Sequence, residues 1–182
     1  LISATAENAD TAIITLSRFS AEGVGRRAIS GDYYLSDAEK SLIDRVSSAF
    51  KKTIVVLNSG GVVDCEHFAE NDKVQGILCG WQGGMEGGMA GADILCGDVN
   101  PSGKLGDTIP KSYDCYENGK MFQTGYEHLD YEDDIYVGYR YFETIPGAAE
   151  KVRYPFGFGL SYTDFEMSGA FCGESKGKIV AV

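Results

Sequence analysis

The chain has 182 residues, enough for one domain with part of a second, and its 43% hydrophobic and 24% charged residues are typical of a globular protein. This composition excludes a disordered, coiled-coil or collagen-like chain, and the apolar runs are too short for a transmembrane helix of about 20 residues. The formal net charge of −11 repels nucleic acid phosphates and anionic membrane surfaces. We therefore expect neither nucleic acid nor a membrane as a partner.

The five cysteines are odd in number and include no C-x-x-C pair that would suggest zinc or a redox dithiol. They are Cys65, Cys79, Cys96, Cys115 and Cys172. We expect buried free thiols in a reducing compartment, the cytoplasm. Residue 1 is Leu and no signal segment follows it, so we also expect the chain to be a fragment of a longer protein.

The first half of the chain alternates strand and helix patterns. Residues 11–16 (TAIITL), 53–58 (TIVVLN) and 74–79 (VQGILC) predict buried strands, the first of them buried on both faces. Ser36 and Glu39 form a capping-box signature, and apolar residues at helical spacing from 42 to 50 predict an amphipathic helix behind it. A helix of small residues over 86–95 should end at Gly97, before Pro101. This order predicts an α/β fold with parallel strands.

The second half is richer in tyrosine, glycine and acidic residues, and it predicts long loops with short strands. Residues 135–142 (IYVGYRYF) are aromatic and strand-like. The glycines of residues 155–162 (PFGFGLSY) indicate a segment packed closely against other backbone. Residues 178–182 (KIVAV) predict a strand whose partners lie beyond this sequence.

Glu22 is the first candidate for chemistry, in the loop after the first predicted strand. Loops at the carboxyl ends of parallel strands are where α/β folds hold ligands, so a reacting carboxyl could lie here. The ordinary alternative is a solvated loop glutamate.

Other motifs have structural explanations. The glycines between 83 and 91 invite a phosphate-binding interpretation, but no G-x-x-x-x-G-K-[ST] is present and Glu86 would repel a phosphate. We expect these glycines to allow close packing of their helix on the sheet. The acidic residues between 127 and 134 lack the spacing of an EF-hand and predict a solvated loop. His67 and His128 are isolated, and we interpret both as structural.

Four stretches together resemble the α/β-sandwich domain of glycoside hydrolase family 3, which includes many β-glucosidases. They are residues 17–27 (SRFSAEGVGRR), 81–110 (WQGGMEGGMAGADILCGDVNPSGKLGDTIP), 137–142 (VGYRYF) and 155–166 (PFGFGLSYTDFE). The resemblance implies a three-layer α/β sandwich around a mainly parallel sheet, with long loops in the second half. It places this domain at residues 1–172, with its first strand missing, and a linker and the start of a following β-sandwich at residues 173–182.

The resemblance also implies a site. The family pattern around its acid/base is similar to S-G-E-G-x-D-R, which places Glu22 on the acid/base Glu and Arg26 on the Arg. Gly25 replaces the usual Asp, so the partner of Arg26 is open, and Ala21 replaces the usual Gly. Arg18 and Phe19 are further candidates for substrate binding. We expect no cofactor and no metal ion.

The nucleophilic Asp of the family lies on a separate (β/α)8 barrel, which this chain lacks. The implied partners are therefore that barrel domain of the same parent enzyme and a β-linked oligosaccharide or glycoside, and the chain alone should be inactive.

Three hypotheses follow. The first is the acid/base domain of a retaining, exo-acting β-glycosidase, in particular a β-glucosidase. The second is a non-catalytic sugar-binding or scaffolding domain of a multidomain glycosidase, in which Glu22 has lost its role. The third, a nucleotide-binding flavodoxin-like domain, rests on fold analogy and the glycine cluster alone.

Overall fold

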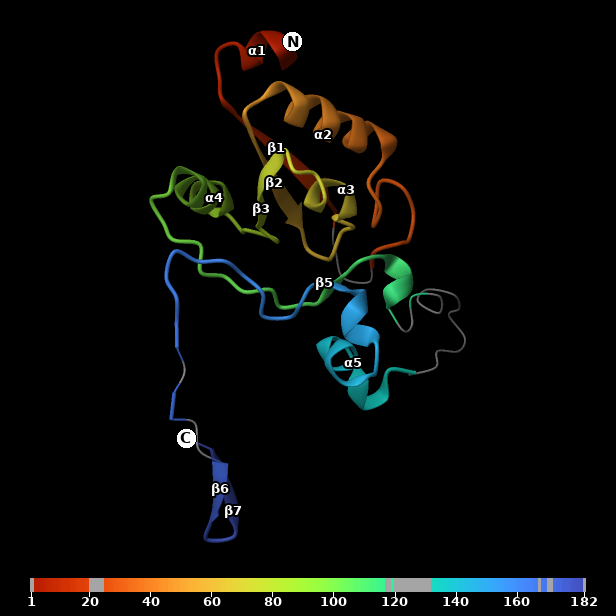
Figure 1. The fold of residues 1–182 in the computed structure, drawn as a ribbon, viewed down its shortest axis with the longest axis vertical. Coiled ribbons are helices and arrows are strands. Elements are labelled where there is room, and N and C mark those ends of the chain that lie inside the picture. The colour runs from red at the N-terminus through yellow and green to blue at the C-terminus, as the bar shows by residue number, and fades with distance from the viewer. Residues whose placement is uncertain are drawn as a thin grey trace.

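Three parallel strands form the centre of the structure, a computed structural model that describes residues 2–19, 25–116, 119, 132–166, 168–169 and 172–181. Strands β1 (Thr11–Arg18), β2 (Lys52–Ser59) and β3 (Val74–Cys79) lie in the order β1-β2-β3 (Figure 1). The register of the first pair sets Ile14 beside Val55 and Leu16 beside Leu57. The predicted α/β fold around a parallel sheet is confirmed.

The main core lies between one face of this sheet and two helices. Ile14 and Leu16 of β1 cluster with Ile43 of α2 (Asp37–Ala49) and with Phe68 of α3 (Glu66–Ala69). Ile43 and Phe68 have no exposed surface. These helices connect β1 to β2 and β2 to β3, so each strand enters the sheet beside the helix that covers it.

The predicted capping box begins α2. The Ser36 hydroxyl accepts a hydrogen bond from the Glu39 backbone N–H at 3.3 Å, and the Glu39 carboxylate accepts one from the Ser36 N–H at 2.8 Å. Both bonds satisfy N–H groups that have no partner inside the helix. The helix therefore starts where the sequence predicts it.

The expectation that β1 is buried on both faces is wrong. Ile14 and Leu16 are each 5% exposed, whereas Ile13, which points to the opposite face of the strand, is 52% exposed. Alternate side chains of a strand point to opposite faces, and α2 covers only one of them. Among the described residues β1 is also an edge strand, with β2 as its one neighbour.

Helix α4 (Gly87–Cys96) follows the prediction, and its C-cap Gly97 has the left-handed φ of 84°. The expected close packing of its glycines on the sheet is wrong, because an added Cβ at Gly87, Gly88 or Gly91 would meet nothing within 4 Å among the described residues. A short helix α1 (Ile2–Ala6) precedes β1. Neither α1 nor α4 has a buried residue.

The second half is mostly loops and short elements, as predicted. Strands β4 (Ile109–Pro110) and β5 (Val152–Tyr154) pair antiparallel. The described part of this half also contains the 3₁₀ turns η1 (Tyr113–Cys115), η2 (Asp134–Tyr136) and η3 (Ala148–Lys151). The predicted strand over residues 135–142 is wrong: η2 and helix α5 (Tyr139–Thr144) occupy it, and the positive φ of Gly138 (68°) turns the chain between them.

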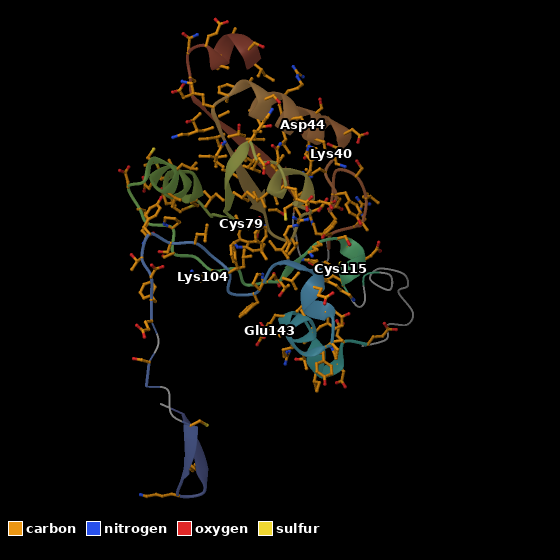
Figure 2. The ribbon with its side chains drawn as sticks, viewed as in Figure 1. Lys40, Asp44, Cys79, Lys104, Cys115 and Glu143 are labelled. Carbon is orange, nitrogen blue, oxygen red and sulfur yellow. The ribbon has the colours of Figure 1, made fainter. Side chains whose placement is uncertain are left out.

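The glycine-rich segment 155–162 does lie against other backbone, as expected. The Leu105 N–H donates to the Phe158 carbonyl at 2.8 Å, and the Gly157 N–H donates to the Leu105 carbonyl at 2.8 Å. A Cβ on Gly159 would collide with the Gly103 carbonyl oxygen. Lys104, labelled in Figure 2, donates to the Gly159 carbonyl at the same crossing.

The last strand, β7 (Lys178–Ala181), pairs antiparallel with β6 (Cys172–Ser175). One edge of β7 therefore has its partner within this sequence, and the expectation that the partners of this strand lie beyond the sequence is wrong for that edge. In Figure 1 this hairpin (blue) lies at the end of an extended segment, away from the parallel sheet. Among the described helices, none is long and apolar enough to cross a membrane.

All five cysteines are free thiols, as expected, but they are not all buried. Cys65 is 2% exposed, and burial raises the pKa of its thiol to about 12. Figure 2 labels Cys79 in β3 and Cys115 in η1, both of which are partly buried. Cys96 and Cys172 are exposed.

Candidate functional site

The candidate site lies in the loop that leaves the carboxyl end of β1. Strand β1 ends at Arg18, and the structure describes the loop again from residue 25. Glu22 lies outside the described residues, so its position past β1 stays a prediction. The candidates Arg18, Phe19 and Arg26, which flank it, are all described.

Arg18 joins the end of β1 to the start of α2. Its two terminal nitrogens donate to the two carboxylate oxygens of Glu39 at 2.6 Å and 3.0 Å, and its Nε donates to the Asp32 carbonyl at 2.7 Å. Burial opposes ionisation of Glu39, but the hydrogen bonds from Arg18 and Ser36 hold its pKa below the usual range. The Arg18 side chain is only 7% exposed. Its position therefore fixes one end of the loop.

Arg26 fixes the other end. Its Nη1 lies 3.1 Å from Oδ1 of Asp32, and Oδ2 of the same carboxylate accepts from the Arg27 backbone N–H at 3.2 Å. Arg26 also donates to the Phe19 carbonyl across the segment that contains Glu22. The side chain of Arg26 is 12% exposed and that of Asp32 is 15% exposed. Asp32 is therefore the acidic partner of Arg26. Gly25, which replaces the usual Asp of the family pattern, cannot be that partner.

Phe19 differs from both arginines because its side chain is free of the core, with 76% of it exposed. An exposed aromatic ring beside a loop held at both ends is available to contact a ligand or another domain. Phe19 and Arg26 are brought together by the bond to the Phe19 carbonyl, whereas Arg18 is directed toward α2.

Two acidic residues of this site were not predicted. Asp32 lies in a turn that follows Gly31, and Glu39 was interpreted only as part of a helix cap. The capping-box signature was the signal for Glu39, but a cap alone does not indicate that its carboxylate also receives Arg18. No short-range pattern links Asp32 to Arg26 six residues earlier.

His67, interpreted as structural, lies with its Nε2 2.9 Å from the carboxylate of Asp44. Figure 2 labels Asp44 and Lys40 one helical turn apart on α2. Over the described ranges, no three His, Cys, Asp or Glu side chains gather closely enough to hold a metal ion. His128 lies outside those ranges.

Comparisons with known proteins identify the class of domain. Residues 2–162 match the family described as the glycosyl hydrolase family 3 C-terminal domain. The chain belongs to this family. It is 47% identical over 187 residues to beta-glucosidase A of Butyrivibrio fibrisolvens, and 37% identical over 170 residues to an exo-alpha-(1->6)-L-arabinopyranosidase of Bifidobacterium longum.

The solved structures agree with this assignment. Beta-glucosidase 3B of Thermotoga neapolitana, in complex with glucose, superimposes on 95% of this chain with a TM-score of 0.83 and 42% identity. The chain covers 24% of that structure, and it spans 22% of the Butyrivibrio relative and 21% of the Bifidobacterium relative. The relatives are thus four to five times longer than the region they share with this chain.

Proposed function

We propose that this chain is the acid/base domain of a retaining, exo-acting β-glycosidase, in particular a β-glucosidase, and that Glu22 is the general acid/base. The observation that carries the proposal is the loop after β1, whose two ends are fixed by Arg18 and Arg26. A catalytic carboxyl on a loop needs such anchoring, because an error of about 1 Å in its position costs roughly 100-fold in rate. The names of the relatives support the reaction class.

In the proposed mechanism Glu22 acts twice. Its protonated carboxyl donates a proton to the departing glycosidic oxygen while an Asp of the parent enzyme's barrel attacks the anomeric carbon. The resulting carboxylate then takes a proton from the water that releases the sugar from the Asp. The barrel and the β-linked glycoside are therefore the proposed partners of this chain, and the chain alone should not turn over substrate.

Arg18 and Arg26 have different proposed roles. Arg18 is a positioning residue, because its guanidinium is engaged by Glu39 and by the Asp32 carbonyl. Arg26 and the exposed Phe19 are the proposed substrate contacts. The pairing of Arg26 with Asp32 weakens the alternative of a scaffold domain, because Asp32 supplies the acidic partner that Gly25 does not.

The test uses the full-length enzyme with Glu22→Ala. A disaccharide needs a protonated leaving oxygen, so its glycosylation step should slow by about 100- to 10,000-fold. Nitrophenolate leaves with little protonation, so the first step with a nitrophenyl β-glucoside should persist. Pre-steady-state release of nitrophenol separates the two steps.

Glu150→Ala is the control, because Glu150 is an exposed glutamate on η3, and it should leave both substrates unaffected. A weak and equal effect of Glu22→Ala on both substrates would assign the acid/base role to another carboxylate. That result would favour the scaffolding function for this domain.

A further inference from the structure

Asp32 contacts both of the arginines that flank Glu22. Its backbone carbonyl accepts a hydrogen bond from Nε of Arg18 at 2.7 Å, and Oδ1 of its carboxylate lies 3.1 Å from Nη1 of Arg26. Arg18 is the last residue of β1, and Arg26 closes the loop by donating to the Phe19 carbonyl. The relative position of the two ends of the loop therefore depends on Asp32.

The turn that carries Asp32 is held in place by its own backbone and by the core. The Asp32 N–H donates to the Ile29 carbonyl at 3.2 Å. The next residue, Tyr33, donates its N–H to the Arg27 carbonyl at 3.1 Å and accepts from the Asp64 N–H at 2.9 Å. Its side chain is only 1% exposed and anchors the turn in the body of the domain. A contact made from such a fixed turn can hold its partner in one geometry.

The two arginine contacts of the Asp32 carboxylate differ in exposure. The side chains of Arg26 and Asp32 are 12% and 15% exposed, whereas that of Arg27, whose Nε lies 3.3 Å from the same carboxylate, is 66% exposed. Water and salt screen an exposed ion pair, so it contributes little. A charge that loses its partner in a partly buried position is costly and tends to move toward water. Removal of the Asp32 carboxylate should therefore displace Arg26 and weaken its bond to the Phe19 carbonyl.

We propose that Asp32 is a positioning residue of the acid/base, and that it acts through Arg26 to set the position of the Glu22 carboxyl. This inference rests on the proposed glycosidase function. Proton transfer needs the carboxyl within about 2.6–3.2 Å of the leaving oxygen, and a misplacement of about 1 Å costs roughly 100-fold in rate. In this role Asp32 exchanges no proton with the substrate.

The experiment uses Asp32→Asn and Asp32→Ala in the full-length enzyme. Asparagine keeps the shape of the side chain but loses the charge that holds Arg26, and alanine removes the side chain. We expect kcat/KM for a β-linked glucose disaccharide to fall by about 10- to 100-fold, mainly through kcat and most in Asp32→Ala. For a nitrophenyl β-glucoside, kcat/KM reports a first step that needs little protonation, so it should change by less than about 3-fold. Two variants are used so that misfolding of one still leaves a test.

A second arm repeats both substitutions in the Glu22→Ala variant. If Asp32 acts by positioning the Glu22 carboxyl, its removal should cost nothing further once that carboxyl is gone. A merely structural role of Asp32 would lower the residual activity of Glu22→Ala by the same factor as in the wild type, and that result would overturn the inference.

The controls break other ion pairs nearby. Arg27→Ala removes the exposed partner of the same carboxylate. Asp10→Asn breaks the pair with Lys51, 2.8 Å long and exposed, next to the amino end of β1. Each should change kcat/KM for both substrates by less than about 2-fold. Equal losses on both substrates in the Asp32 variants, or an unchanged disaccharide rate, would overturn the inference.

The same measurements separate this inference from the proposed function. If Glu22→Ala slows the disaccharide selectively but Asp32→Asn does not, the acid/base assignment stands and the inference alone fails. If Glu22→Ala affects both substrates weakly, the acid/base assignment fails. A selective loss in Asp32→Asn would then show that Asp32 positions another carboxylate, which would overturn the inference as stated.

Discussion

Residues 11–79 and residues 101–166 differ in how completely they bury their large apolar side chains. In the first region Val55 and Phe68 have no exposed surface, because two helices close over one face of the sheet. In the second region Phe158 and Phe165 are 39% and 83% exposed, and no regular sheet covers them. The comparison teaches that the first region forms most of the core, to which the second region adds Ile109, whereas the second region leaves more of its large aromatic side chains exposed.

The largest expected effect contrasts one phenylalanine from each region. Phe68→Ala should lower the free energy of unfolding of the chain by about 3–5 kcal/mol, because it leaves a cavity in a closed core. Phe165→Ala should change it by no more than about 0.5 kcal/mol. Urea unfolding followed by circular dichroism measures both. Similar costs for the two variants would contradict the division into a core-forming and a more exposed region.

Glu39→Gln should have the next largest effect, since it removes the charged partner of the nearly buried Arg18. The expected loss at pH 7 is about 1–3 kcal/mol. The folded-state pKa of Glu39 is held below its unfolded value, so the contribution of its carboxylate is present above the unfolded pKa of about 4.3. It is lost as pH falls through the folded pKa.

The free energy of unfolding measured from pH 7 to pH 3 tests the direction of this pH dependence. The wild type should lose stability toward acid more steeply than Glu39→Gln, so the difference between them should shrink. Glu143→Gln is the control, because Glu143 is an exposed glutamate on α5. A constant difference across the pH range would mean that the carboxylate charge contributes nothing.

The smallest effect concerns two glycines of α4, at the junction of the two regions. Gly97→Ala should destabilise by about 1 kcal/mol, because its φ of 84° strains any residue with a Cβ. Gly91→Ala lies inside the helix with open space around its Cβ, and it should stabilise by about 0.5–1 kcal/mol. Thermal unfolding of both variants measures the difference. A loss of stability in Gly91→Ala would show that another element covers this helix.

The first region could be predicted because its signals are local. The strand at 53–58 and the capping box of Ser36 and Glu39 depend on neighbours within a few residues. The strand predicted over 135–142 failed because aromatic residues favour strands only where a sheet is available to receive them. At this position Tyr139 stacks on Phe156, with ring centroids 4.3 Å apart, and a short helix forms instead.

The candidate site was predicted only in part, for the same reason. The motif in residues 17–27 indicates Glu22 and Arg26, because their spacing along the chain resembles a family pattern. The pairing of Arg26 with Asp32 spans six residues of one irregular loop, and the edge-to-face contact of Tyr33 with Tyr113 joins loops that are distant in sequence. Such contacts have no periodicity to detect.

The role of Glu22 as acid/base is tested most directly by azide in the full-length Glu22→Ala variant. Azide needs no general base, so it should attack the anomeric carbon of the glycosyl-enzyme where water no longer can. With nitrophenyl β-glucoside as substrate, we expect azide to restore turnover and the product to be the β-glucosyl azide, identified by NMR. If azide leaves the rate unchanged and only glucose forms, Glu22 is not the acid/base.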